Sequence, residues 1–243
     1  KPKSSGCLFR SLGLLVVHVH LERENLYLGA SYGMRSKGGT GGMKYDPGNK
    51  FYDEMFEKSQ QVRPHYEGVQ AYVDDLGIEE FQRRHQLLDV AFRNQGITFT
   101  VYGDSQGTER TFPFEPVPRI IPASEWAHVE AGLTQRVKAL NAFLRDIYSD
   151  AQILGDGVIP AELVYTSSHF RREVHGVLPP QGLFTHIVGT DLIRDEKGEY
   201  LVLEDNLRSP SGVSYLLAIR QAMTRIYPGM FEGQGVRPVQ HYT

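Results

Sequence analysis

The chain has 243 residues, of which 40% are hydrophobic and 23% are charged, and its formal net charge is −3. This balance is ordinary for a globular protein and has no basic excess, which argues against a nucleic-acid partner. A single cysteine, Cys7, permits neither an internal disulfide nor a cysteine zinc site. No apolar stretch reaches the roughly 18–20 residues that span a bilayer. We therefore expect a protein of the reducing cytoplasm, without a membrane partner.

The first 43 residues differ in composition from the rest of the chain. They are rich in Gly, Ser and Lys, and residues 35–43 favour a flexible linker over a phosphate-binding loop, because the Gly-Lys-Ser/Thr ending is absent. The apolar run 12–19 resembles a signal peptide only weakly, since it is short and contains His18. We interpret residues 1–43 as a poorly ordered segment, separate from a domain that covers residues 44–243.

Apolar residues at intervals of three and four predict two long helices. The first covers residues 78–93 and stops at Asn94-Gln95-Gly96. The second covers residues 125–148, with Ser124 as its N-cap and a continuous apolar stripe from Trp126 to Ile147. The length and caps of the second helix are typical of a helix that packs on a globular core.

Shorter elements fill the remaining sequence. β-branched and aromatic residues predict strands, and turn residues separate them into hairpins. The predicted elements are a hairpin of 97–102 with 108–114, a short strand at 162–165, a hairpin of 183–193 with 200–204 around the turn 195–198, and a final helix at 211–227. Helices mixed with antiparallel strands indicate an α+β fold.

The candidate chemistry lies in the second hairpin and the residues after it, 183–214, which we call the acidic hairpin. If Arg194 lies opposite Glu199, then Asp191 faces Val202 across the ladder. Side chains on one face recur at every second residue, so Asp191, Val202, Glu204 and Asn206 share a face. Asp191 and Glu204 are then diagonal neighbours, about 7 Å apart at the backbone.

Two carboxylates and an amide oxygen form a hard ligand set that suits Mg²⁺, which takes its other ligands from water and phosphates. By strand parity Asp205 is the least suited of the three residues 204–206 to bind this ion. Arg208 could bind a phosphate or carboxylate, and Ser211 and Gly212 could offer N–H groups to an anion at the start of the last helix. The alternative is that residues 204–206 form only a solvated strand end.

The sequence from Val202 to Tyr215 resembles the signature of circularly permuted type 2 ATP-grasp proteins, relatives of glutathionylspermidine synthetases. The resemblance continues in four earlier blocks in the same order and covers roughly residues 44–240. The blocks are Tyr52-Asp53-Glu54-Met55-Phe56, Asn94-Gln95-Gly96-Ile97-Thr98-Phe99, Pro118-Arg119-Ile120-Ile121-Pro122 and Phe170-Arg171-Arg172-Glu173.

The resemblance implies an ATP-grasp-like mixed sheet with packed helices. It implies that Asp191, Glu204 and Asn206 bind Mg²⁺ and ATP, in a ligase that forms an acyl phosphate and then an amide-type bond. The substrates would be small molecules or peptides that carry a carboxylate and an amine.

Family members are longer than this chain, and beyond residue 100 it contains only two lysines, Lys138 and Lys197, to grip nucleotide phosphates. We therefore expect this chain to be the N-terminal part of such a protein. The competing interpretation is a non-catalytic scaffold or peptide-binding module that has kept the fold.

Overall fold

The computed structural model describes residues 52–58, 61–100, 115–210 and 212–242, and the strand backbones of 14–19 and 109–111. The chain forms two compact units. The described part of the first consists of residues 14–19, 123–193 and 200–210. The second contains the described residues between 52 and 122, the turn 194–199, and residues 212–242. None of the helices in these ranges is long and apolar enough to cross a membrane.

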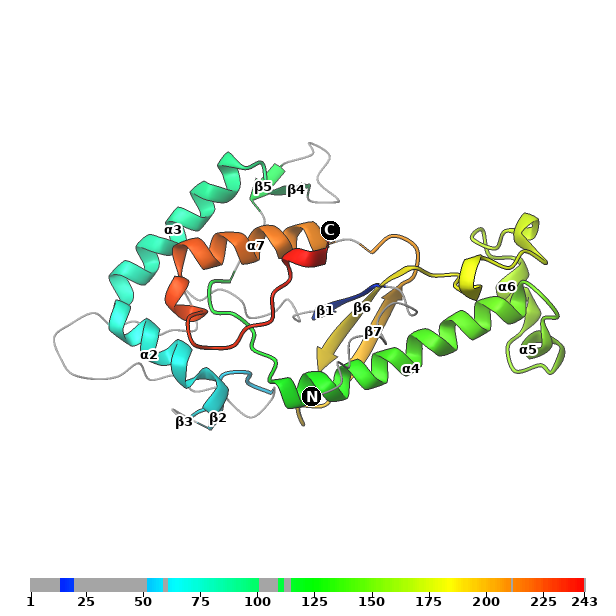
Figure 1. Cartoon of the computed structure of the whole chain (residues 1–243), viewed down its shortest axis with the longest axis horizontal. Coiled ribbons are helices and arrows are strands. Elements are labelled where there is room, and N and C mark those ends of the chain that lie inside the picture. Colours follow the sequence, from blue (N-terminus) through cyan, green and yellow to red (C-terminus); the bar gives the residue numbers. More distant parts are fainter. Residues whose placement is uncertain are drawn as a thin grey trace, which may run out of the picture. The chain divides into compact units, whose positions relative to one another are not determined.

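The first unit is built on a three-stranded sheet in the order β1-β6-β7 (Figure 1). Strand β6 (Ile187–Arg194) lies in the middle, with β7 (Tyr200–Asn206) as its hairpin partner. Strand β1 (Leu14–Val19) pairs with β6 in parallel, with His18 opposite Asp191. This strand lies inside segment 1–43, for which the sequence predicts no regular element.

The long helix α4 (Ala123–Ile147) runs along one face of this sheet. Val129 and Leu133 of α4 are buried against Leu192 of β6. Three partly buried side chains complete this cluster, namely Trp126, Tyr200 and Val202. The apolar stripe thus faces the core, as its spacing predicts. The helix begins at Ala123, so Ser124 lies within its first turn and the prediction of Ser124 as N-cap is wrong.

A buried asparagine connects α4 to the segment before β6. Asn141 donates from Nδ2 to the hydroxyl of Thr185 at 2.8 Å, and its Oδ1 accepts from the backbone N–H groups of Phe184 and Thr185. It also donates to the carbonyl of Val137. Its hydrogen-bonding groups are therefore satisfied, as burial of an amide requires.

The C-terminal end of α4 carries a small lobe with two short helices, α5 (Gln152–Gly155) and α6 (Ala161–Tyr165), and two 3-10 turns, η3 (Arg172–Val174) and η4 (Pro180–Gly182). The predicted strand at 162–165 is therefore wrong. Pro160 precedes a helical turn that Thr166 closes by donating to the carbonyl of Glu162.

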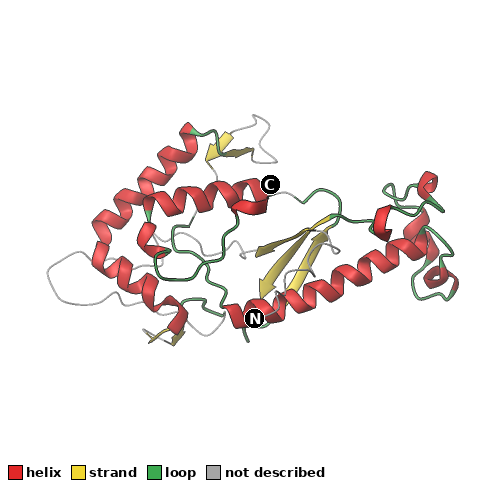
Figure 2. Cartoon of the chain, viewed as in Figure 1, coloured by secondary structure: helices red, strands yellow, loops and turns green. Residues whose placement is uncertain are grey.

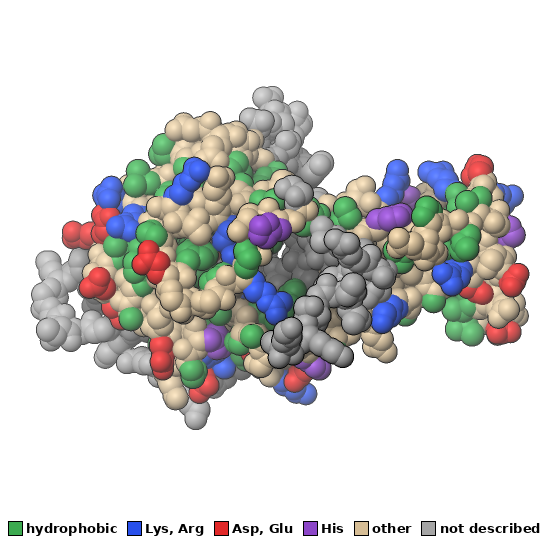
Figure 3. All heavy atoms as spheres, in the orientation of Figure 1, with side chains coloured by type: hydrophobic (Ala, Val, Ile, Leu, Met, Phe, Trp, Pro, Cys, Tyr) green, Lys and Arg blue, Asp and Glu red, His purple; other side chains and the backbone are tan. Residues whose placement is uncertain are grey.

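Ile147, Leu154 and Val164 form the core of this lobe, and Tyr148 stacks on Phe170 and Phe184. Apolar and charged side chains mix on its surface (Figure 3).

The second unit is mainly helical (Figure 2). Its helices are α2 (Glu67–Leu76), α3 (Ile78–Asn94) and α7 (Val213–Ile226), with 3-10 turns η2 (Pro64–Tyr66), η5 (Pro228–Met230) and η6 (Gln240–Tyr242). Small hairpins pair β2 (Phe56–Lys58) with β3 (Gln61–Val62), and β4 (Thr98–Thr100) with β5 (Glu109–Thr111). The predicted helices at 78–93 and 211–227 and the first predicted hairpin are confirmed in type, with shifted ends. The final helix, α7, starts at Val213 and not at the predicted Ser211.

The core of the second unit packs aromatic and aliphatic side chains from α2, α3 and α7. Its buried members are Tyr66, Val69, Phe81, Leu88, Phe92, Ala222, Met223, Tyr227 and Met230. Tyr66 is 1% exposed, and its hydroxyl accepts a hydrogen bond from the backbone N–H of Ile120 at 2.8 Å. Burial raises the pKa of Tyr66 to about 12.

We expect this pKa to contribute to alkaline unfolding. In the unfolded chain a tyrosine loses its proton near pH 10, whereas folded Tyr66 keeps its proton until about pH 12. The stability that protonated Tyr66 contributes is therefore complete below pH 10 and is lost as the pH rises to about 12. Denaturant unfolding at pH 8 and pH 11 should therefore show a smaller loss of stability in Tyr66→Phe than in the parent. Equal losses in both proteins would contradict this origin.

The turn of the acidic hairpin requires a glycine. The N–H of Gly198 donates to the carbonyl of Asp195, and the N–H of Asp195 donates to the carbonyl of Glu199. This is a three-residue loop with Gly198 in the left-handed region, at φ +87°. A Cβ at Gly198 would also lie 2.6 Å from the ring of Tyr52.

We expect Gly198→Ala to destabilise the protein more than Gly96→Ala. Gly96 also has positive φ, but a Cβ there meets nothing within 4 Å, so it reports the backbone cost alone, about 1 kcal/mol. Overlap with Tyr52 should add ~1–3 kcal/mol at Gly198. Chemical denaturation of both variants measures the difference, and equal free energies of unfolding would show that the ring moves away freely.

Candidate functional site

Backbone hydrogen bonds at the turn determine the register of the acidic hairpin. Because the N–H of Asp195 donates to the carbonyl of Glu199, Arg194 lies opposite Tyr200, and the predicted pairing of Arg194 with Glu199 is wrong. Counting three residues along each strand puts Leu203 opposite Asp191. This register is consistent with the packing of Leu192 and Val202 in one cluster beside α4.

Further along the hairpin the register changes by one residue. The hydroxyl of Thr190 donates to Oδ1 of Asp205 at 2.9 Å, and a Cβ built on Gly189 would lie 3.7 Å from Cβ of Asn206. These contacts pair residue 190 with 205 and 189 with 206. Strand β7 therefore has one extra residue, and both Leu203 and Glu204 lie opposite Asp191.

Two observations support this slip. Leu203 and Glu204 are consecutive and both exposed, which a regular alternating strand would not give when one face is covered. Val202 packs in the cluster beside α4, and Asp205 pairs with Arg136 of α4. The two residues thus face the same side of the sheet although they are three positions apart. A strand with one extra residue is the pattern of a β-bulge, which re-aims side chains and is common beside active sites.

Because of this slip, the predicted shared face of Val202, Glu204 and Asn206 is wrong in one residue. Val202 packs toward α4 and does not share a face with Asn206, so strict alternation from 202 to 206 is wrong. Glu204 and Asn206 still lie on one side, because Nδ2 of Asn206 donates to Oε1 of Glu204 at 3.1 Å. Gly189 and Asp191 of β6 are on the same side of the sheet, opposite to Thr190. By this register, Asp191, Glu204 and Asn206 lie on the same side of the sheet.

The three candidate ligands differ in exposure. Asp191 is 7% exposed in the central strand, whereas Glu204 is exposed and Asn206 is partly buried. Since the amide nitrogen of Asn206 is used by Glu204, its Oδ1 remains the atom suited to a cation. A buried carboxylate, an exposed carboxylate and an amide oxygen fit Mg²⁺, which binds one or two carboxylates and completes its shell with water or phosphates.

Within the described residues, no group of three or more His, Cys, Asp or Glu side chains could hold a metal ion. The candidate set contains two such residues, Asp191 and Glu204, together with the amide of Asn206.

Asp205 takes part in other contacts, on the face of the sheet that α4 covers. Its Oδ2 accepts from Nε of Arg136 at 2.7 Å while Oδ1 accepts from Thr190, and its side chain is 9% exposed. Both oxygens point toward the α4 side of the sheet. Asp205 is therefore a structural anchor on the face opposite to the candidate ligands.

The other candidate residues follow the hairpin. Arg208 is exposed two residues after β7. Gly212 is the N-cap of α7 with φ 91°, and its carbonyl accepts from the N–H of Leu216. Ser211 lies outside the described residues. Gly212 belongs to the second unit, while Arg208 belongs to the first.

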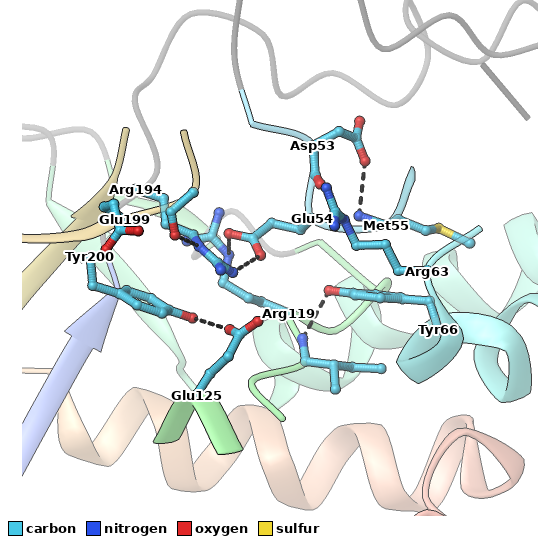
Figure 4. Close-up of polar contacts among 12 residues, drawn as sticks. Asp53, Glu54, Met55, Arg63, Tyr66, Arg119, Glu125, Arg194, Glu199 and Tyr200 are labelled. Carbon is cyan, nitrogen blue, oxygen red and sulfur yellow. Dashed lines mark hydrogen bonds and ion pairs between the residues drawn. The ribbon is translucent and has the colours of Figure 1, made fainter. Parts of the chain in front are cut away.

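A cluster around Glu54 in the second unit was not singled out as a site by the sequence (Figure 4). Glu54 accepts from Arg194 at 2.9 Å and pairs with Arg119 at 3.5 Å. The guanidinium groups of Arg194 and Arg63 lie 4.2 and 4.3 Å from the ring centre of Tyr52. Two of the blocks that carry the family resemblance, 52–56 and 118–122, thus meet at the turn end of the acidic hairpin.

An α+β fold with an acidic strand hairpin is the arrangement that the resemblance predicts for an ATP-grasp protein. Residues 118–243, half of the chain, match the family described as a circularly permuted ATP-grasp. An uncharacterized protein of Synechocystis is 46% identical over 198 residues, which cover 82% of this chain and 41% of that protein. An uncharacterized protein of Mycobacterium leprae is 48% identical over 191 residues, covering 79% of this chain and 33% of the relative.

A protein of Frankia casuarinae with the provisional name glutamate–cysteine ligase 2-2 is 37% identical over 187 residues, covering 76% of this chain and 21% of its own length. A Frankia alni protein has a similar name and the same identity over 195 residues. The chain therefore spans less than half the length of these relatives. It belongs to the circularly permuted ATP-grasp family, and the names of these relatives mark the family as one of ligase type.

The Glu54 cluster gives a stability prediction. Arg194 is 9% exposed, so loss of the charge on Glu54 removes a charge-assisted hydrogen bond from a buried guanidinium. We expect Glu54→Gln to lower the free energy of unfolding by about 1–3 kcal/mol.

Glu57→Gln is the matched control. Glu57 is 42% exposed and 3.9 Å from Arg63, so its replacement should cost less than about 0.5 kcal/mol. Indistinguishable unfolding curves for the two variants would show that the Glu54 pairs contribute nothing to stability.

Proposed function

We propose that this chain supplies the metal-binding hairpin of an ATP-dependent ligase that joins a carboxylate to an amine. The observation that carries the proposal is the slip in β7, because it gathers Asp191, Glu204 and Asn206 on one side of the hairpin while Asp205 faces α4. Family membership and the ligase names of the Frankia relatives support the same class of reaction.

Each residue has a specific task in this proposal. Asp191 and Glu204 provide negative charge for a Mg²⁺ ion, and Asn206 adds its amide oxygen. When bound, this ion would neutralise charge on the transferring phosphate of ATP. Arg208 orients a phosphate or the substrate carboxylate, and Ser211 and Gly212 offer backbone N–H groups to an anion.

The proposed reaction has two balanced steps. A substrate carboxylate oxygen attacks the γ-phosphorus of ATP, so that an acyl phosphate forms and ADP leaves. An amine then attacks the acyl carbon, phosphate leaves, the nitrogen loses a proton and an amide-type bond remains. The acceptor would be a small molecule or peptide, and the setting would be the cytoplasm, in keeping with the single cysteine.

The relation between this chain and its longer relatives defines the proposed domain. We assign residues 44–243 to the N-terminal portion of the permuted ATP-grasp domain, and residues 1–43 to a segment outside it. Strand β1 lies in that segment and pairs with β6, so the outer segment would still contribute to the sheet.

The proposal predicts that Mg·ATP binding depends on Glu204. In calorimetric titrations of the protein encoded by the complete gene, Glu204→Gln should weaken Mg·ATP binding at least about tenfold. Glu199→Gln makes the same chemical change at the turn of the same hairpin and should leave the affinity unchanged. The 243-residue chain alone should bind ATP weakly or undetectably.

Three results would contradict the proposal. Absence of Mg·ATP binding by the complete protein would favour a non-catalytic module that has kept the fold. Binding that Glu204→Gln leaves unchanged would show that the nucleotide site lies elsewhere. Micromolar affinity in the 243-residue chain would also show that the nucleotide site has been misplaced.

A further inference from the structure

The anchor of Asp205 determines which side chains of β7 face Asp191. In a regular strand that keeps Val202 on the α4 side, Glu204 would also point toward α4, and Asp205 would point to the side of Asp191. The observed strand has the reverse arrangement beyond Leu203. The slip therefore decides whether Glu204 or Asp205 faces the same side of the sheet as Asp191.

Two side chains hold Asp205 in the slipped position. Thr190 is fully buried, and its hydroxyl donates to Oδ1 of Asp205 at 2.9 Å. Arg136 donates to Oδ2 at 2.7 Å from α4. Hydrogen bonds to a charged acceptor are stronger than neutral ones, and the low exposure of Asp205 protects them from water.

On the face of the sheet opposite to α4, position 189 next to Thr190 has room only for glycine. A Cβ at Gly189 would lie 2.6 Å from Cβ of Pro210 and 3.7 Å from Cβ of Asn206. Pro210 therefore packs closely over β6 at the place where Asn206 leaves the sheet. This contact is consistent with the slipped register on the side of the candidate ligands.

We propose that Thr190 and Arg136 are positioning residues for the metal site: by binding Asp205 on the α4 side, they hold the slip that presents Glu204 and Asn206 beside Asp191. Neither residue touches the proposed ion. The inference rests on the proposed function, because it explains how the ligands of that site are oriented.

The test compares two changes at one buried position. Thr190→Val keeps the shape and removes the hydroxyl, whereas Thr190→Ser keeps the hydroxyl. Mn²⁺ is the probe, since it prefers the same oxygen ligands as Mg²⁺. In the complete protein, with ATP present and well below the melting temperature, free Mn²⁺ is measured by electron paramagnetic resonance.

We expect Thr190→Val to weaken Mn²⁺ binding at least about tenfold and Thr190→Ser to restore affinity to within about twofold of the parent. A purely structural role would lower the melting temperature of Thr190→Val and leave its Mn²⁺ affinity unchanged. That result would overturn the inference.

Arg136→Met provides a second variant if Thr190→Val does not fold, because the Arg136 side chain is 44% exposed on α4. It should weaken Mn²⁺ binding severalfold, with partial recovery in Arg136→Lys. Lys138→Met removes another exposed cation from the same helix and should have no effect. Equal affinities in Arg136→Met and Lys138→Met would overturn the inference.

Glu204→Gln separates this inference from the proposed function. If Glu204→Gln leaves Mn²⁺ binding unchanged, the metal site itself is misplaced. If Glu204→Gln weakens binding while Thr190→Val and Arg136→Met do not, the metal site is supported but Thr190 and Arg136 do not position it.

Discussion

The candidate site depends on the fixed position of one carboxylate that does not belong to it. Asp205 accepts hydrogen bonds from Thr190 and Arg136 on the α4 side of the sheet. Because Val202 faces the same side three residues earlier, β7 must contain one extra residue between them. That extra residue turns Glu204 and Asn206 toward the side of Asp191, where we propose that the three residues bind one cation.

Helix α4 is the element that makes this arrangement possible. Its apolar stripe packs on Leu192, which fixes the face of the sheet that the helix covers. The same helix contributes Arg136 to the anchor of Asp205 and Asn141 to the segment that leads into β6. One helix thus constrains both strands of the acidic hairpin. At the other end of the hairpin, backbone hydrogen bonds close the turn at Gly198, and Arg194 donates to Glu54.

Elements with strong local patterns could be predicted from the sequence. The period of Val129, Leu133 and Val137 is sufficient to predict α4, and Asp195–Gly198 predicts a hairpin turn. The sequence predicts a strand where the five-residue helix α6 lies. A short run such as Glu162–Tyr165 is too short to distinguish the helical period of 3.6 residues from the strand period of 2. Strand β1 was missed because its parallel partner lies far away in the sequence.

The candidate ligands were predicted from residue types and family resemblance, but their geometry was not. Strict alternation assumes a regular strand, and no pattern in residues 200–206 indicates an extra residue. The slip depends on Arg136, about 70 residues away along the chain, so it is a tertiary effect. Which arginine of α4 contacts Asp205 depends on how the helix packs on the sheet, and the sequence alone does not give this packing.

The most direct test is the position of a bound ion in crystals of the complete protein with Mn²⁺ and a non-hydrolysable ATP analogue. We expect an anomalous peak at bonding distance from carboxylate oxygens of Asp191 and Glu204 and from Oδ1 of Asn206, with phosphate oxygens completing the shell. Asp205 should remain bound to Thr190 and Arg136. A peak coordinated by Asp205, or a nucleotide-bound Mn²⁺ ion away from this hairpin, would show that Asp191, Glu204 and Asn206 are not the metal ligands.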